Sequence, residues 1–147
     1  MIRVKVSLFF TIIIVLTQIS PVFSQTPDSS GSIIIRTVNL SSDEGCVRVA
    51  LFDSEESFTI EPLMGESGEI TGKVSEVIFE NVPFGDYAVA VFHDENNNEE
   101  MDTNFLGIPS EAYGFSNGAE GTFGPPDFDE AKFHFNSFEA IIEIEVN

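Results

Sequence analysis

The 147-residue chain has no tryptophan, one cysteine and only six basic residues. A single cysteine excludes an internal disulfide, and Cys46 lies too far along the chain to be a lipid-modified first residue. We expect it to be a small buried side chain at the start of a strand. The sequence also lacks a Gly-rich phosphate loop, a nucleophile elbow and clustered His and Cys for zinc. It therefore carries none of the usual signatures of nucleotide, serine-hydrolase or zinc chemistry.

The N-terminus has the pattern of a secretory signal peptide. Arg3 and Lys5 precede an apolar run over 6–16, and small side chains at Val22 and Ser24 suit cleavage after residue 24. A membrane anchor is the alternative, but the run is shorter than the ~20 apolar residues that a spanning helix needs. We expect export to the periplasm or the extracellular space, with no transmembrane segment after cleavage. The predicted organisation is a signal peptide over 1–24, a flexible leader over 25–31 and a single domain over 32–147.

The chain that remains after cleavage is strongly acidic. Arg3 and Lys5 leave with the signal, so four basic residues stand against 25 acidic ones, a net charge of −21. Such a surface repels nucleic acid and anionic membranes, so we expect an envelope or extracellular ligand instead. Fifteen phenylalanines supply more apolar surface than a disordered acidic tail carries. The excess charge serves solubility, and binding of a divalent cation is the sharper hypothesis.

Six segments have the composition and alternation of half-buried strands, and no stretch offers a useful helical period. Turn residues at 41–45 and 83–85 predict two hairpins, which would join the first pair of strands and the next pair. The Gly-rich stretch over 58–72 reads as a loop that crosses between sheets. This pattern predicts an all-β protein, an antiparallel Greek-key β-sandwich of the transthyretin or immunoglobulin type. The six segments are 32–39, 46–53, 73–81, 86–93, 131–135 and 139–146.

A stretch of 36 residues over 94–129 lacks a strand pattern. Loops of that length are uncommon in compact domains and are usually functional or disordered. This one contains several aromatic residues, so we expect an ordered excursion. Tyr113, Phe115 and Phe123 could form a ligand platform for sugar or peptide. We favour the alternative, in which they pin the excursion to the sandwich, because a long loop must bury something to be ordered.

The excursion opens with an acidic, Asn-rich loop over 94–102. Its oxygen-bearing side chains fall at the first, third, fifth and ninth places of a calcium loop, and the carbonyl of residue 100 falls at the seventh. Glu111 could fold back as a further carboxylate. The alternative is a solvated turn, because Asn and Asp also favour turns for local reasons. The predicted Ca²⁺ ligands are Asp94, Asn96, Asn98, Glu100, Asp102 and Glu111.

Two positions depart from a standard calcium loop. Glu99 occupies the sixth place, where an EF-hand has Gly for its sharp turn, and Phe105 occupies the twelfth, where a bidentate Glu belongs. No helical pattern flanks the loop, so it is not an EF-hand.

A hydrolase is the competing hypothesis. His93, with Asp94, Asp102 and Glu111, could carry out acid and base chemistry. His93 ends a strand with the parity of core residues, so we expect it to be structural. The sequence leaves open whether the protein is an enzyme.

Several motifs together resemble a secreted bacterial family described only as a domain of unknown function. They are His-Asp-Glu-Asn at 93–96, Asp-Thr-Asn at 102–104, Gly-Ile-Pro-Ser-Glu at 107–111, Gly-Phe-Ser-Asn at 114–117 and the stretch over 79–89. The resemblance implies export and one domain, and it supplies no activity. In that family the place of Glu99 is usually Gly.

The aromatic residue, the Pro-Gly turn and the Tyr over 79–87 are also similar to transthyretin-like and collagen-adhesin B-type sandwich modules. Some modules of that kind bind calcium through comparable loops. This similarity bears on fold more than on function.

Overall fold

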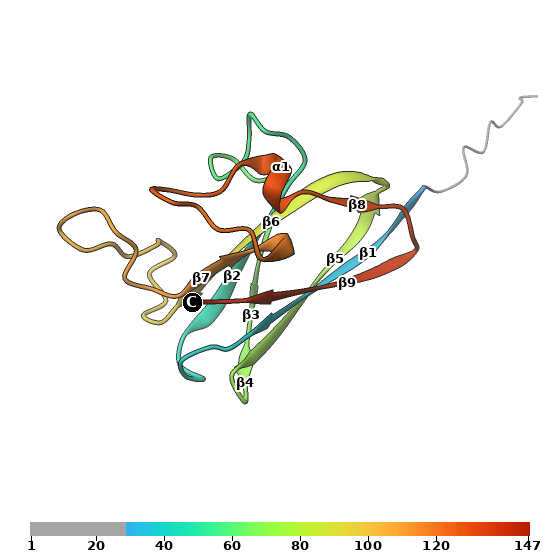
Figure 1. Cartoon of the computed structure of the whole chain (residues 1–147). Coiled ribbons are helices and arrows are strands. Elements are labelled where there is room, and N and C mark those ends of the chain that lie inside the picture. The colour runs from blue at the N-terminus through green and yellow to red at the C-terminus, as the bar shows by residue number, and fades with distance from the viewer. Residues whose placement is uncertain (1–28) are drawn as a thin grey trace, which may run out of the picture.

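The computed structural model describes residues 29–147 and shows two β-sheets packed face to face (Figure 1). The predicted signal peptide lies outside the described residues. One sheet has the order β4-β5-β1-β9, with β1 at Ser30–Val38, β4 at Ile70–Thr71, β5 at Val74–Pro83 and β9 at Glu139–Glu145. The other has the order β3-β2-β6-β7, with β3 at Met64–Gly68, β2 at Cys46–Phe52, β6 at Gly85–Asp94 and β7 at Tyr113–Phe115. In addition, β8 at Phe133–Phe135 pairs with β6.

The predicted all-β sandwich is confirmed. Its ladders are antiparallel except for β1 with β9, which pair in parallel. The first strand begins at Ser30, inside the segment predicted as leader.

Both predicted hairpins are wrong. β1 pairs with β5 and β9, whereas β2 pairs with β3 and β6, so the turn over 41–45 connects two different sheets. The Pro-Phe-Gly turn at 83–85 likewise passes from β5 to β6 in the opposite sheet. Asp43 fixes the first crossing, because its carboxylate accepts the backbone N–H groups of Gly72 and Lys73 at 2.9 and 2.6 Å. These two bonds tie the crossing to the turn between β4 and β5.

Two stretches predicted as loops contain strands. The segment over 58–72 holds β3 and β4, and the excursion holds β7. Gly114, in the middle of β7, lies against β9, and an added Cβ there would stand 2.5 Å from the Glu145 carbonyl. These strands have two to five residues, and β3 and β7 contain glycine. They are therefore too short and too poor in side chains to show an alternation of apolar and polar residues.

The main core lies between the two sheets and follows the predicted alternation. Each strand directs every second side chain inward, and a buried aliphatic or aromatic layer results. Tyr87 closes one end, where its hydroxyl donates to the Pro83 carbonyl at 2.8 Å. The fully enclosed members include Ile33, Ile35, Val47, Leu51, Phe79, Val82, Val89, Phe135 and Ile144.

A second apolar cluster, the outer cluster, covers part of the outer face of the β2–β6 sheet. Its centre is Phe58, whose ring meets three other phenylalanine rings at centroid distances of 5.3 to 5.9 Å. The short helix α1 (Phe128–Ala131) and the 3₁₀ turn Ser116–Gly118 lie beside it. Its buried members are Phe52, Phe58, Ala88, Phe115, Phe128 and Ala131.

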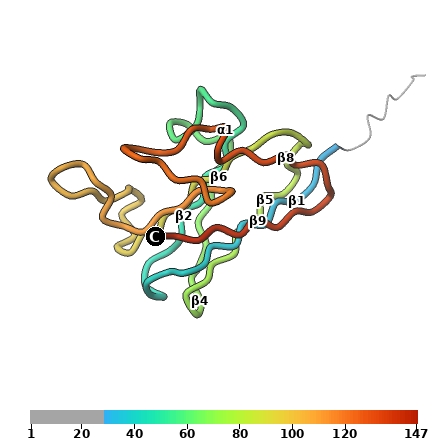
Figure 2. The backbone as a smooth tube through the Cα atoms, viewed as in Figure 1, coloured from blue at the N-terminus to red at the C-terminus, as the bar shows by residue number. Residues whose placement is uncertain are grey.

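The segment between β6 and β7 projects beyond the sheets, at the left of Figures 1 and 2. Within residues 29–147, no helix is long and apolar enough to cross a membrane.

Candidate functional site

Asp94 begins the acidic loop and is completely buried at the end of β6. Its Oδ1 accepts the N–H of Asn98, and its Oδ2 accepts the N–H of Glu99 and Nε of Arg48, each at 3.0 Å. Burial alone would raise the pKa of Asp94. The Glu99 N–H, the Arg48 guanidinium and the Asn98 N–H together outweigh it, so the pKa lies below its ordinary value. The carboxylate is therefore a charged anchor for the loop.

The side chains of Asn96, Asn98 and Asp102 face one another. Oδ1 of Asn96 accepts the N–H of Asn98, and Oδ1 of Asn98 accepts the N–H of Glu100, each at 2.9 Å. Their amide nitrogens donate to the two oxygens of Asp102, at 2.6 Å from Asn96 and 3.0 Å from Asn98. The sequence spacing thus produces two consecutive Asx turns that converge on one carboxylate.

Glu111 returns to this loop, as the sequence suggested that it could. Its buried carboxylate accepts the N–H of Glu95 on Oε1 and the N–H of Asp102 on Oε2, both at 3.0 Å. One side chain therefore closes the loop by joining its beginning to its end.

Glu99 has φ of +70°, in the left-handed region that favours glycine. This is the sixth place of the loop, so the chain makes the sharp turn that a calcium loop requires, although with a non-glycine residue. The Glu99 carboxylate also lies 3.2 Å from Nη2 of Arg48. Arg48 consequently contacts two carboxylates of the same loop.

The structure thus gathers all six predicted calcium ligands in one loop and its closing side chain. Among the described residues, no group of three or more His, Cys, Asp or Glu side chains has an arrangement that could hold a metal ion. That statement does not cover Asn96 and Asn98, which are amides, or Glu100, which was predicted to contribute only its backbone carbonyl. Calcium binding stays a prediction.

His93 is held inside the sandwich. Its Nε2 lies 2.8 Å from the Glu44 carbonyl, and its Nδ1 lies 3.3 Å from Oγ of Ser41, which donates to Glu95 at 2.6 Å. No part of the ring is exposed. A general base must reach the proton that it abstracts, so this geometry supports the structural role. His134, at the surface, bonds Asp86.

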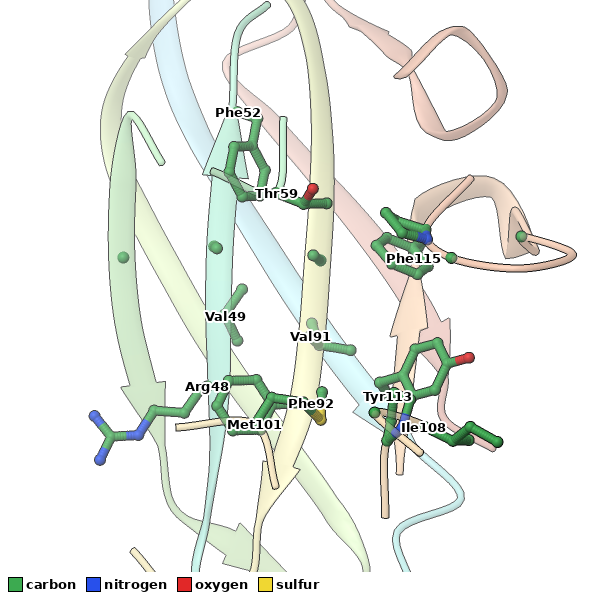
Figure 3. A pocket seen from close by; sticks show the side chains of 18 of the residues that line it. Arg48, Val49, Phe52, Thr59, Val91, Phe92, Met101, Ile108, Tyr113 and Phe115 are labelled. Atoms are coloured by element: carbon green, nitrogen blue, oxygen red, sulfur yellow. The ribbon is translucent and has the colours of Figure 1, made fainter. Parts of the chain in front are cut away.

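An apolar trough crosses the outer face of the β2–β6 sheet, beside the acidic loop (Figure 3). Its floor is a row of small residues that lie opposite one another on three neighbouring strands, namely Gly65, Ala50 and Ala90. The next row toward the loop contains Arg48 and Phe92. At the other end, Phe52 belongs to the outer cluster. The small floor residues leave a depression between Arg48 and Phe92 on one side and Phe52 on the other.

The excursion forms the walls of this trough. One wall is a tight hairpin over 102–110, held by the Thr103–Pro109 bridge and the bond from Asn104 N to Ile108 O at 2.8 Å. The other is the segment over 121–125. The trough is open on one side and has a volume of about 1060 Å³.

Not all aromatic residues of the excursion are buried. Phe115 packs in the outer cluster, whereas Phe123 is fully exposed beside the trough, and Phe105 is 95% exposed at the tip of the hairpin. The expectation that Phe123 pins the excursion is therefore wrong. Sequence reasoning also missed the trough, although the signal was present: Ala88 and Ala90 alternate with large core residues in β6.

Among curated proteins none matches the chain, and no solved structure matches it. A family model does match, over residues 35–143, which include every strand of the sandwich in whole or in part as well as the acidic loop and the trough. The family is described as uncharacterized proteins conserved in bacteria. The chain belongs to this family, DUF2141.

Proposed function

We propose that the protein is an exported module of the cell envelope that binds an apolar ligand in the trough. The observation that carries the proposal is the trough itself, with a volume of about 1060 Å³ and a floor of alanine and glycine. Ligand sites are typically concave, largely apolar and of this size. Export rests on the predicted signal peptide, and N-terminal sequencing of protein from the periplasm or medium should begin at Gln25.

Exposed apolar residues around the trough support the same function. Leu106 and Ile108 on one wall and Phe123 on the other remain largely exposed. Contiguous exposed apolar surface on a soluble protein often marks an interaction site. A role in packing alone does not explain these side chains, because an apolar residue stabilises the fold only when it is buried.

The acidic loop supports one end of the trough. Glu99 and Met101 belong to the loop and line the trough, and Arg48 joins the trough to Asp94. Glu111 closes the loop by accepting the N–H groups of Glu95 and Asp102. The role of the loop in this proposal is to hold the first wall in position.

Calcium is the proposed stabiliser of that loop, held by Asp94, Asn96, Asn98, Glu100, Asp102 and Glu111. The left-handed turn at Glu99 supports this assignment, because a calcium loop turns sharply at its sixth place. Glu111 brings a further carboxylate to the same loop. Calcium that binds only the folded state would raise the melting temperature.

The trough is tested with an environment-sensitive apolar dye. The purified protein should enhance the fluorescence of the dye, and Ala90→Leu should lower the enhancement because leucine fills the floor. Gly65→Val is a second filling variant, since an added Cβ there meets no atom nearer than 4.0 Å. Thr71→Leu, exposed on the other sheet, is the matched control. Equal dye binding by all four proteins would contradict the proposal.

Calcium is tested by thermal melting in a chelator and in millimolar calcium. The wild type should melt at a higher temperature with calcium, and Asp102→Asn should remove the difference. Asp102 is the better choice than Asp94, because Asp94 also anchors Arg48. Identical melting temperatures of the wild type in both conditions would contradict calcium binding by the loop. The proposal that the trough binds a ligand would stand.

A further inference from the structure

The two ends of the trough are bordered by acidic segments without a basic residue. Thr59, from the segment over 53–61, lines one end, and Glu99, from the acidic loop, lines the other. The first segment holds four carboxylates and the second five. They are Asp53, Glu55, Glu56 and Glu61 in the first, and Asp94, Glu95, Glu99, Glu100 and Asp102 in the second.

Arg48 is the one basic residue among those that line the trough, and its charge is already matched. Its Nε bonds the buried Asp94, and its Nη2 lies 3.2 Å from Glu99. An anionic ligand such as a fatty acid would find no unmatched positive charge there. It would also have to approach a chain with a formal net charge of −19.

We infer that the ligand is a cationic amphipathic peptide, an inference that rests on the proposed binding function of the trough. Its apolar side chains would lie on the floor formed by Ala50 and Ala90. Its Lys or Arg side chains would reach the exposed carboxylates of the end segments, a set that excludes the buried Asp94. The exposed ring of Phe123 adds a surface over which a cation is favourable. Complementary charge of this kind guides association and selects the partner.

The floor also explains why large peptide side chains are suited to this site. Ala50 and Ala90 lie directly opposite each other, and Ala50 in turn lies opposite Gly65. The depression therefore runs across the strands and not along one of them. Ala50 and Ala90 lie on the interior strands β2 and β6, and the trough runs over the face of the sheet. A ligand on this floor therefore contacts side chains and is not hydrogen-bonded as an added strand.

The experiment measures fluorescence anisotropy of a labelled peptide of Leu and Lys with the purified protein. We expect saturable binding that Ala90→Leu and Gly65→Val each weaken by about tenfold or more, with unchanged melting curves. A second comparison tests charge. The double variant Glu55→Gln/Glu56→Gln removes two carboxylates at one end of the trough. The control Glu80→Gln/Glu139→Gln removes two exposed carboxylates from the other sheet. Only the first pair should weaken binding, and high salt should do the same.

Three results would overturn the inference. One is equal binding of a Leu and Glu peptide of the same length. Another is binding that the filling variants leave unchanged. A third is uptake of the protein by zwitterionic vesicles in preference to the peptide. If the peptide fails while the apolar dye still depends on Ala90 and Gly65, the peptide assignment falls and the proposed trough remains.

Discussion

Arg48 donates from Nε to the completely buried carboxylate of Asp94 at 3.0 Å, across neighbouring strands of one sheet. Removal of the carboxylate would leave Nε of Arg48 and two loop N–H groups without their acceptor. We therefore expect Asp94→Ala to lower the free energy of unfolding by about 3–5 kcal/mol, as for a broken buried pair. Denaturant titration measures this, with the exposed Glu100→Ala as the control, expected within about 0.5 kcal/mol of the wild type. A small effect at Asp94 would mean that water replaces its partners.

Acid should destabilise the protein through two carboxylates. Hydrogen bonds from Gly72 and Lys73 N–H hold the pKa of Asp43 below its ordinary value, and that of Asp94 is also lowered. A folded-state pKa below the unfolded value gives stability above the unfolded pKa, near 3.9, and this is lost as the pH falls through the folded pKa. Denaturant titrations at pH 7, 5, 4 and 3 should show a smaller loss below pH 4 for Asp43→Asn than for the wild type. Parallel curves would contradict the assignment.

Glu99 sets a backbone cost against an ion pair. Its φ of +70° costs a non-glycine residue about 1 kcal/mol or more, whereas its exposed pair with Arg48 contributes about 0–1 kcal/mol. Glu99→Gly should therefore leave stability unchanged or raise it by up to about 1 kcal/mol. Glu99→Ala loses the pair and keeps the strain, so it should be less stable than the glycine variant by denaturant titration. The reverse order would show that the pair outweighs the backbone.

Glu111 holds the two ends of the acidic loop with one carboxylate. In Glu111→Gln one of the two N–H groups would face an amide NH₂, and leaving a buried donor without its acceptor costs about 1–3 kcal/mol. Hydrogen exchange should rise at the amides of Glu95 and Asp102 more than in the strands. Glu120→Gln, exposed in the same excursion, provides the comparison and should leave the exchange pattern unchanged.

Two phenylalanines that both lie outside the strands should lose very different amounts of stability when they are replaced by alanine. Phe58 contacts three rings in the outer cluster, so Phe58→Ala should cost about 3–5 kcal/mol. Phe123 is fully exposed, so Phe123→Ala should change the free energy of unfolding by less than about 0.5 kcal/mol. Thermal or denaturant unfolding of both variants decides this. A large loss at Phe123 would place that ring in a packed environment.

The alternation of the sequence predicted the inward faces of the strands well. In the predicted strand over 86–93, the large alternate residues Tyr87, Val89 and Val91 share one face and are buried. Phe135 and Ile144, in the last two predicted strands, are buried as well. Period-2 patterning responds to burial, which depends only on the face that a residue occupies. It contains no information about which strand lies alongside, and this is why both hairpins were assigned wrongly. A Gly-containing turn suits a crossing between sheets as well as a hairpin.

The acidic loop was predicted from spacing, and its closure by Glu111 followed from the need for one more carboxylate. The alanines of β6 signal a face of small residues, but spacing alone does not show a trough, because its floor combines small residues from three strands. Gly65, Ala50 and Ala90 come from three strands whose order the sequence did not reveal. Only the pairing register places them in one row.

Because Arg48 lies between the acidic loop and the trough, it couples ligand binding at these two adjoining sites. The same guanidinium borders the trough and pairs with two carboxylates of the loop, so a cation bound in the loop would change the electrostatic field at the trough. Such coupling is reciprocal by thermodynamic necessity. A cation that drew Asp94 away from Arg48 would leave Arg48 with Glu99 as its one remaining partner. More of its positive charge would then face the trough and weaken the binding of a cationic peptide. Calcium in the loop and a cationic peptide in the trough would then each weaken the binding of the other.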